Sequence, residues 1–439
     1  MPGSPGCSWR LFWERTRAKF EGADLRVCIA FWLFGLVNNI LYVVILSAAL
    51  DLVGPSIPKA TVLLASIIPS LATKLVVPYV IHLVPYSSRI LIFAALSTCG
   101  MLLVALSPPT TTASSIASKV AGIILANISS GAGEVNFLSL THFYGSFSLA
   151  AWGSGTGGAG LIGAGAYAIA TTLLGVSVRA TLLTSALLPV AMLVSFFTLL
   201  PRGPLKAART KEVDYSRLAV DEEDDAARET AGLLDVPSAT AYGKADPTQL
   251  TRALQDLKAK LLRARSLIIP YMGPLFLVYL AEYTINQGVA PTLLFPLEET
   301  PFKHYRAFYP TYSALYQLGV FISRSSLAIF RIKTLYIPSF LQILNLGVLT
   351  AHALFPFIPT VYFVFAIVLW EGLLGGVVYV STYAAVQEEV PEDEREFSLG
   401  AVAVSDAVGI CFAGFLGVGM ESGICGWQVQ HGRDWCRRL

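Results

Sequence analysis

Residues 129–165 read SSGAGEVNFLSLTHFYGSFSLAAWGSGTGGAGLIGAG and place one carboxylate and a dense run of glycines inside apolar sequence. A lone glutamate in an apolar membrane helix costs a few kcal/mol unless it faces a polar cavity or a charged partner. A glycine in a helix interior costs about 1 kcal/mol relative to alanine. We therefore expect Glu134 to face a cavity or a partner. The glycines should let helices pack closely, chiefly through Gly155, Gly157, Gly158 and Gly160.

The composition of the whole chain explains why this stretch is apolar. Of 439 residues, 54% are hydrophobic and 14% are charged, whereas soluble globular chains carry roughly 25% charged residues. The mean hydropathy is +0.62. These values indicate a polytopic membrane protein. The balance of 31 basic and 29 acidic residues, without a basic stripe between aromatic residues, argues against a nucleic-acid partner.

Eleven stretches have the length and apolarity of a membrane-spanning helix, which needs about 20 residues. They are expected at 27–50, 60–84, 89–107, 115–141, 150–175, 180–200, 267–290, 307–330, 334–355, 359–383 and 398–420. The sequence therefore predicts an all-α polytopic protein with about eleven transmembrane helices.

A long hydrophilic connection divides these spans into two halves. The expected segments are an N-terminal cytosolic tail at 1–26, a six-helix half at 27–200, a largely disordered cytosolic loop at 201–266, a C-terminal helical half at 267–420 and a tail at 421–439. Within the loop, Leu250 to Arg265 has the pattern of a basic amphipathic helix on the membrane surface. Two halves joined in this way are typical of the major facilitator plan, in which spans one, four, seven and ten line a central cavity.

The distribution of Lys and Arg predicts the orientation. With a cytosolic N-terminus, the cytosolic segments hold 22 of these residues and the opposite side holds 5, which is a strong positive-inside signal. An eleven-span chain then ends on the lumenal side, with three arginines in its tail. Cys425 and Cys436 could form a disulfide in that compartment.

Polar residues are concentrated in the four spans that should line the cavity: Asn38 and Asn39 in the first, Asn127, Glu134 and Asn136 in the fourth, Glu282, Asn286 and Gln287 in the seventh, and Glu371 in the tenth. The three carboxylates suit the binding of a proton or a solute during a change of access. The alternative is that these groups are hydrogen-bonding glue between helices. We favour binding for Glu134 and Glu282 and glue for the asparagines, and both alternatives stay open for Glu371.

Three further charges are candidates for a gating or structural ion pair. Lys74, within the second span, needs a partner, for which Glu134 is the obvious candidate. Asp406, inside the eleventh span, could cap a local helix break or pair across the bundle. Arg324 is near the predicted cytosolic end of the eighth span, where snorkelling to lipid headgroups explains it. A gating ion pair is the alternative for Arg324.

No catalytic chemistry is evident. Gly155, Gly157 and Gly160 match GxGxxG, but a dinucleotide site needs a preceding strand, and here the motif opens a membrane helix. The sequence shows no nucleophile beside a base, no metal-ligand cluster and no phosphate loop. We therefore expect no enzyme activity, no cofactor and no metal.

The central loop carries a candidate sorting signal. Glu229, Leu233 and Leu234 fit the acidic dileucine pattern ExxxLL. In a flexible cytosolic segment such a pattern can bind sorting adaptors, which would direct the protein to the lysosome or vacuole.

Several long motifs, in the same order, resemble the battenin family. They include FWLFGLVNNILYVVILSAA, SSGAGEVNFLSLTHFY, SGTGGAGLIGA, VYLAEYTINQG, YQLGVFISRSSL, WEGLLGGVVYV and REFSLGAVAVSD, and cover about residues 27–200 and 265–418. The short connection at 51–59 is similar to that of fungal members. The chain ends Cys436-Arg-Arg-Leu, which departs from the prenylation box of animal members because arginines replace aliphatic residues.

The resemblance implies a major-facilitator-like protein of the vacuolar or lysosomal membrane, linked to lumenal pH, to basic amino acids in fungi and to glycerophosphodiesters in animals. It also places Glu134, Glu282, Arg324 and Asp406 in functionally sensitive segments. Our main hypothesis is a proton-linked transporter of a small polar solute. The alternative is a non-transporting organiser or trafficking factor that acts on vacuolar pH through partners.

Overall fold

The computed structural model describes residues 21–48, 59–108, 113–207 and 247–438, and the regular elements in those ranges are helices. The N-terminal half contains α2 (Leu25–Ser47), α4 (Lys59–Val80), α5 (Tyr86–Leu106), α6 (Ala113–Thr141), α7 (Ser146–Ala168), α8 (Val178–Ser185) and α9 (Leu188–Val194). The C-terminal half contains α11 (Pro247–Leu267), α12 (Gly273–Thr284), α13 (Phe308–Ser325), α14 (Tyr336–Leu354), α15 (Val361–Glu389), α16 (Glu392–Val402) and α17 (Val404–Gln430).

Nine helical stretches in the described ranges are long and apolar enough to cross a membrane. The two other expected spans are helices as well, α7 and α13, but small and polar residues lower their mean hydropathy. These two helices pack against each other between the halves, while Ile162 on α7 and Leu318 and Ile322 on α13 remain exposed. Their lower hydropathy agrees with a position in which part of each helix faces the other half.

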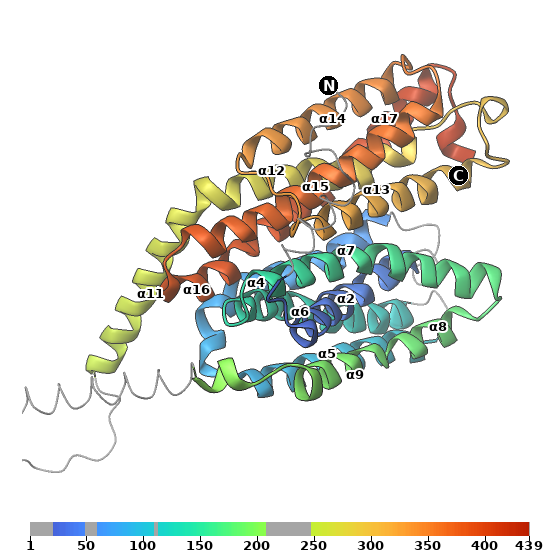
Figure 1. Ribbon diagram of the computed structural model, residues 1–439. Helices are drawn as coiled ribbons and strands as arrows, with labels where there is room; N and C mark the ends of the chain where they lie inside the picture. The colour runs from blue at the N-terminus through green and yellow to red at the C-terminus, as the bar shows by residue number, and fades with distance from the viewer. Residues whose placement is uncertain (1–20, 49–58, 109–112, 208–246, 439) are drawn as a thin grey trace, which may run out of the picture.

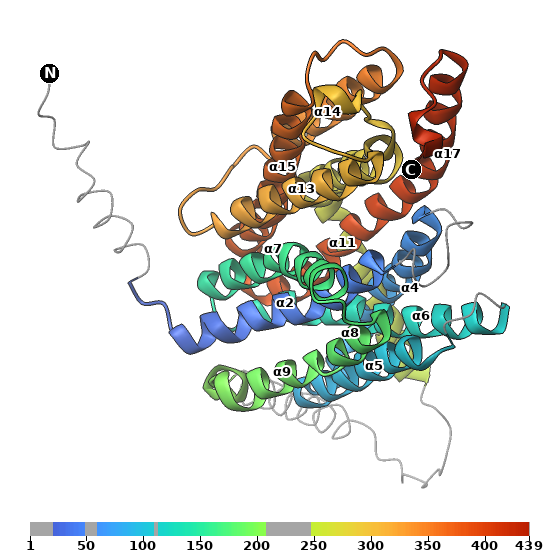
Figure 2. The ribbon, with the colours of Figure 1, turned by 90° about the vertical axis from the view of Figure 1, so that its right-hand side faces the viewer.

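The two halves form the two layers of the bundle. In Figure 1 the C-terminal half, in orange and red, lies above the N-terminal half, in blue and green, and Figure 2 shows the same division from the side. Between the halves, α7 packs on α13 and α15, α4 packs on α17, and α6 packs on α16. The prediction of an all-α membrane protein in two helical halves is confirmed.

The glycines of α7 serve both the N-terminal half and the contact between halves. A Cβ at Gly155 would overlap the backbone carbonyl of Trp32 on α2, so only glycine allows this approach of two backbones. A Cβ at Gly160 would overlap the side chain of Gln317 on α13. Gly157 also faces α13, and Gly158 lies between the two neighbouring helices. The glycines of α7 therefore pack against α2 on one side and against α13 on the other.

The packing of the two halves differs along the bundle. We call the end at which α2 begins the proximal end, and the end at which α17 finishes the distal end. The largest apolar core includes residues of both halves at the proximal end, such as Phe31, Trp152, Tyr383 and Leu399. Toward the distal end, the described residues form one core in each half. The halves are therefore most closely joined at the proximal end.

Polar contacts also join the halves at the proximal end. The Tyr86 hydroxyl donates to Glu396 Oε1 at 2.5 Å, and the Ser139 hydroxyl donates to the Glu396 carbonyl at 3.0 Å. The Gln387 amide donates to the Thr141 carbonyl at 3.4 Å. Burial lowers the pKa of His142 at the same end. The hydrogen bonds fix α5 and α6 against α15 and α16.

Two helix boundaries differ from the expected ones. The candidate surface helix is α11, which continues through a π turn at Ile268–Met272 directly into α12 and projects from the bundle in Figure 1. It therefore extends a span instead of forming a separate surface element. The last helix, α17, runs to Gln430, beyond the predicted end at residue 420, because Ile424 and Gln428 are buried against the C-terminal half.

The C-terminal segment is covalently bonded to the end of α17 at the distal end. A disulfide joins Cys425 of α17 to Cys436 of η10 (Trp435–Arg438). Disulfides persist in oxidising compartments, so this bond agrees with a lumenal C-terminus. It also leaves Cys436 without the free thiol that prenylation requires.

Candidate functional site

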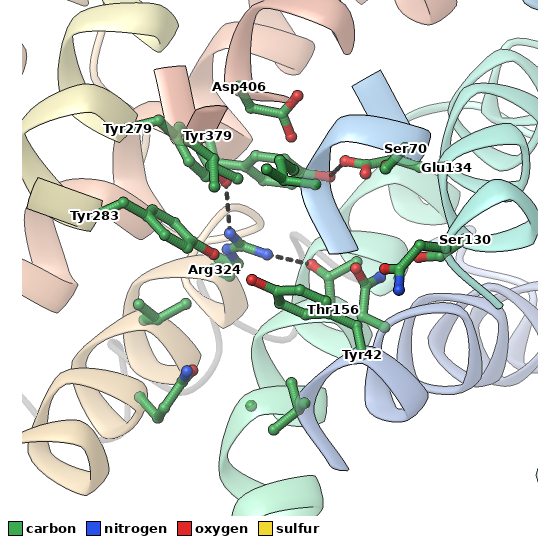
Figure 3. A pocket seen from close by; sticks show the side chains of 18 of the residues that line it. Tyr42, Ser70, Ser130, Glu134, Thr156, Tyr279, Tyr283, Arg324, Tyr379 and Asp406 are labelled. Atoms are coloured by element: carbon green, nitrogen blue, oxygen red, sulfur yellow. Dashed lines mark hydrogen bonds between the residues drawn. The ribbon is translucent and has the colours of Figure 1, made fainter. Parts of the chain in front are cut away.

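A polar cavity of about 110 Å³ lies between the two halves near the middle of the bundle. Its walls come from α2, α4, α6 and α7 on one side and from α12, α13, α15 and α17 on the other. Figure 3 shows its side chains converging from both halves. The volume is below the roughly 300–1,000 Å³ that is usual for small-molecule sites.

The base of the cavity contains a buried ion cluster. Lys74 on α4 lies between two carboxylates, with its Nζ 2.7 Å from Glu134 Oε2 and 3.0 Å from Asp406 Oδ1. Lys74 is 2% exposed, and the two acids are 9% and 4% exposed. Lys74 and Glu134 belong to the N-terminal half, whereas Asp406 belongs to α17. The cluster therefore includes one ion pair within a half and one between halves.

The predicted pairing of Lys74 with Glu134 is thus present, and Asp406 pairs across the bundle. Asp406 Oδ1 also accepts from the backbone N–H of Ala407 at 2.6 Å, which places the carboxylate at the start of α17. A helix N-terminus favours a negative charge, so the fold stabilises Asp406 independently of the lysine. Asp406 therefore does both things expected of it as alternatives: it lies at a helix start and it pairs across the bundle.

Glu134 is also held by hydrogen bonds from the C-terminal half. The Tyr379 hydroxyl donates to Glu134 Oε1 at 3.1 Å and accepts from Trp152 Nε1 at 3.1 Å. Because Trp152 is on α7 and Tyr379 is on α15, this chain of bonds crosses between the halves. Any separation of the halves at the proximal end must break it.

Arg324 points into the cavity, which corrects the expectation that it snorkels to lipid headgroups. Its Nη1 donates to the Thr156 hydroxyl at 2.8 Å, and its Nη2 donates to the Tyr279 hydroxyl at 2.8 Å. The guanidinium lies 4.1 Å from the centroid of the Tyr379 ring. Figure 3 shows it between Tyr279 and Thr156. Arg324 lies in the last turn of α13, beside the exposed Ile322, but its side chain turns inward to the cavity.

The gating ion pair, the alternative considered for Arg324, is also absent. Among the described residues Arg324 forms no ion pair, and its buried Nε has no hydrogen-bond partner. A guanidinium held by neutral hydroxyls retains its positive charge without a compensating carboxylate. Arg324 is therefore the cation of the cavity that remains available to an anionic ligand.

Tyrosines make up much of the cavity wall, which the sequence did not predict. They are Tyr42, Tyr279, Tyr283, Tyr316 and Tyr379. The spacing of Tyr279 and Tyr283 was a usable signal, because residues four apart share a helix face with the neighbouring polar positions. Aromatic side chains are common in apolar cores, and this made the signal weak. Ser70, Thr156 and Gln317 also line the cavity without having been predicted.

Glu282, Glu371 and Asn286 do not line this cavity, contrary to the expected cavity wall. They lie within the C-terminal half, where Glu282 is 1% exposed and Glu371 is fully buried. Asn286 Nδ2 donates to Glu371 Oε1 at 3.1 Å. Their helices were assigned to the correct half, but the side chains point toward neighbours in that half.

The asparagines of the N-terminal half divide between the wall and the helix packing. Asn39 and Asn127 line the cavity. Asn38 Nδ2 donates to the Ser130 carbonyl at 3.1 Å, and Asn136 Oδ1 accepts from Arg89 Nη1 at 3.2 Å. Asn38 and Asn136 thus connect helices, which is the role favoured for asparagines.

A larger cavity of about 320 Å³ lies at the distal end of the C-terminal half. Its lining includes His352, Gln428 and Arg433 together with apolar side chains. Burial lowers the pKa of Arg433. This cavity belongs to one half and contains no residue of the ion cluster, so the cavity between the halves is the stronger candidate. Among the described residues no group of three His, Cys, Asp or Glu could hold a metal ion.

Comparison with known proteins identifies close relatives. Residues 29–427 match the CLN3 protein family, which is the battenin family of the sequence resemblance. Similar proteins include Protein btn1 of Aspergillus fumigatus, which is 60% identical with 100% of this chain and 97% of that protein aligned. Protein btn-1 of Neurospora crassa is 55% identical with the same coverage, and Protein BTN1 of Yarrowia lipolytica is 47% identical over 95% of this chain and 99% of that protein.

Among solved structures, the Escherichia coli fucose:proton symporter superposes with a TM-score of 0.45 at 13% identity. The superposition covers 92% of this chain and 97% of that chain.

Proposed function

Because the chain belongs to the CLN3 protein family, we propose that it is a secondary transporter of the vacuolar or lysosomal membrane. It moves a small polar solute by alternating access, in a proton-linked cycle that contributes to lumenal pH homeostasis. The lipid bilayer surrounds the two halves, and the solute binds in the cavity between them. The N-terminus faces the cytosol.

The packing of the halves supports alternating access. The shared core closes the proximal end, whereas each half has its own core toward the distal end. Two-layer transporters of this kind work by rocking one half against the other around a central site. In that motion the Lys74–Asp406 pair separates, while the Lys74–Glu134 pair stays within its half. Lys74 therefore keeps one counter-ion in either state.

The single observation that carries the solute class is the cavity cation without a counter-ion. Lys74 is already matched by two carboxylates, whereas the Arg324 guanidinium, among the described residues, donates to two hydroxyls and lies over an aromatic ring without forming an ion pair. Guanidinium groups bind phosphate oxygens through pairs of N–H donors. A basic amino acid would instead bring a second cation beside Arg324. We therefore favour a glycerophosphodiester over a basic amino acid as the solute.

The tyrosines complement an anion of this type. Their hydroxyls can donate to phosphate or glycerol oxygens, and their rings provide apolar surface for the rest of the solute. The Tyr279 hydroxyl already accepts a hydrogen bond from Arg324 Nη2 at 2.8 Å. Binding of an anion at Arg324 would compete with that bond, so solute binding changes the contact between α12 and α13.

Transport into proteoliposomes tests the proposal. The full chain is reconstituted, and uptake of radiolabelled glycerophosphocholine is measured with and without excess lysine as competitor. Loss of hydrogen bonds to a charged group costs about 1.5–3 kcal/mol. Arg324→Ala should therefore raise KM by about 10- to 150-fold. Arg324→Lys should fall between this variant and the wild type, because it retains charge but not the paired donors.

The matched control is Arg179→Ala, since Arg179 is exposed and outside the cavity. This variant should transport like the wild type. Saturable uptake of lysine in place of glycerophosphocholine would overturn the solute class. Absence of uptake of either solute by the wild-type protein would overturn the transporter proposal.

The vacuolar or lysosomal address rests on the family and on the predicted sorting signal. Glu229, Leu233 and Leu234 lie outside the described residues, so adaptor binding stays a prediction. Replacing both leucines with alanine in a fluorescently tagged full chain should move the protein from the vacuole to the cell surface. Unchanged vacuolar localisation would remove this signal from the proposal.

A further inference from the structure

Two buried carboxyl groups in the C-terminal half lie outside the lining of the cavity between the halves. Glu282 on α12 and Glu371 on α15 are 1% and 0% exposed. In each side chain Oε2 is buried without a hydrogen-bond partner. Among the described residues neither group forms an ion pair with a lysine or an arginine. Their negative charges therefore lack the compensation that Lys74 gives to Glu134 and Asp406.

The two carboxyl groups lie against the same helix face. Glu282 Oε2 occupies the position that a Cβ on Gly375 of α15 would take. Gly375 is four residues after Glu371, so both project on one face of α15. Asn286 connects the two residues, because its Nδ2 donates to the Glu282 carbonyl at 3.0 Å and to Glu371 Oε1 at 3.1 Å. The fold thus brings an acid of α12 onto the acid-bearing face of α15.

The remaining charged and titratable groups around this pair are occupied elsewhere. From α13, Arg324 donates to Thr156 and Tyr279. From α17, Asp406 is paired with Lys74. From α14, Tyr336 donates to the Ile269 carbonyl, and His352 accepts from the backbone near residue 357. Tyr279 and Tyr283 of α12 are neutral phenols. Among the described residues, Arg324 is the cation whose charge acts on Glu282, and it forms no ion pair with either carboxyl group.

We propose that Glu282 and Glu371 form a proton-binding site, in which the two carboxyl groups share at least one proton. Two close carboxylates in apolar surroundings cannot both remain ionised at low cost. When one carries a proton, the pair holds one negative charge instead of two. On release, the proton leaves as H⁺ to water in the cavity, and the carboxylate remains. The inference rests on the proposed function and identifies the group that links transport to protons.

Tyr316 connects this site to the solute cavity. Its hydroxyl donates to Glu282 Oε1, and its ring lines the cavity beside Arg324 and Tyr279. A protonated Glu282 is a weaker acceptor than an ionised one. Proton binding therefore releases the Tyr316 hydroxyl toward the solute, and proton loss draws it back. This is a direct physical route by which the proton load changes solute binding.

Infrared spectroscopy tests the proton site without requiring transport. Purified full-length protein in liposomes at neutral pH should show a carboxylic-acid C=O band that shifts in D₂O. The band should be lost or reduced in Glu282→Gln and in Glu371→Gln, because glutamine copies the protonated acid without its proton. The control Glu299→Gln changes an exposed carboxylate of η8 (Leu297–Glu299) and should leave the band intact. A band that is unchanged in both site variants would overturn the inference.

A second measurement tests coupling in the same liposomes. We expect solute-dependent proton movement, followed by a pH-sensitive dye, to fall to the level of protein-free liposomes in both site variants. Exchange of internal for external glycerophosphocholine should remain measurable. Normal proton movement in both variants would overturn the inference even if the protein transports. Loss of exchange in the wild type would instead refute the proposed function, while the infrared result would still decide the proton site.

Discussion

Replacement of Lys74 by methionine should be among the most destabilising single changes in the chain. At an effective dielectric constant of about 20, a unit-charge pair 3 Å apart is worth about 5–6 kcal/mol. Lys74 makes two such pairs, at 2.7 and 3.0 Å. Lys74→Met removes both attractions and leaves Glu134 and Asp406 buried without a cation. Breaking a buried pair by removal of one partner costs about 3–5 kcal/mol, and we expect Lys74→Met to reach that range.

Replacement of one carboxylate should lower the free energy of unfolding less than replacement of Lys74. Asp406→Asn leaves Lys74 paired with Glu134, so no charge is left without a partner, and we expect a cost of at most about 2 kcal/mol. The triple variant with Lys74→Met, Glu134→Gln and Asp406→Asn removes the whole cluster. It should recover most of the stability lost in Lys74→Met, because neutral groups carry a smaller desolvation cost.

Reversible unfolding of the full chain in mixed detergent micelles measures these free energies. Lys333→Met is the matched control, because Lys333 is exposed and should change the free energy of unfolding by less than about 0.5 kcal/mol. The reasoning fails if Lys74→Met is within about 1 kcal/mol of the wild type. It also fails if Asp406→Asn is more destabilising than Lys74→Met.

Three further predictions concern other parts of the fold. Gly155→Ala should lower the free energy of unfolding by about 1–3 kcal/mol, because its Cβ would overlap the Trp32 carbonyl. Gly165→Ala is the control, because a Cβ at that position would point into open space and should leave the free energy of unfolding unchanged. Equal effects of the two substitutions would argue against the close approach of α2 and α7. Cys425→Ser should lower the free energy of unfolding by up to about 3 kcal/mol, because it removes the disulfide that closes a loop between residues 11 apart in sequence. Reaction of Cys425 or Cys436 with maleimide in the unreduced wild type would contradict the disulfide. The folded-state pKa of His142 is lowered, so the unfolded chain binds a proton more readily and the wild type should lose stability as pH falls below about 6.5. His142→Gln should lack this part of the loss, and parallel pH profiles of the two proteins would refute it.

The sequence by itself determined the class of fold. The length and apolarity of the spans follow from the thickness of the bilayer, and the hydrophilic connection at 201–266 marks the division into halves. The sequence also identified Glu134 and Lys74 as partners, because each charge in an apolar helix requires compensation and few candidates exist within one half. The spans expected at 150–175 and 307–330 are also present, as α7 and α13, although their mean hydropathy is lower than that of the other spans.

Only the tertiary structure decided which side chains meet between the halves. Arg324 looked like an interfacial residue because hydropathy reports distance from water along a span, not the direction in which a side chain points. Glu282 and Glu371 share cavity-lining helices but face a different neighbour, since rotation of each helix about its axis is set by packing against partners distant in sequence. The pairing of Lys74 with Asp406 links positions 332 residues apart, and only the docking of α4 against α17 brings them together.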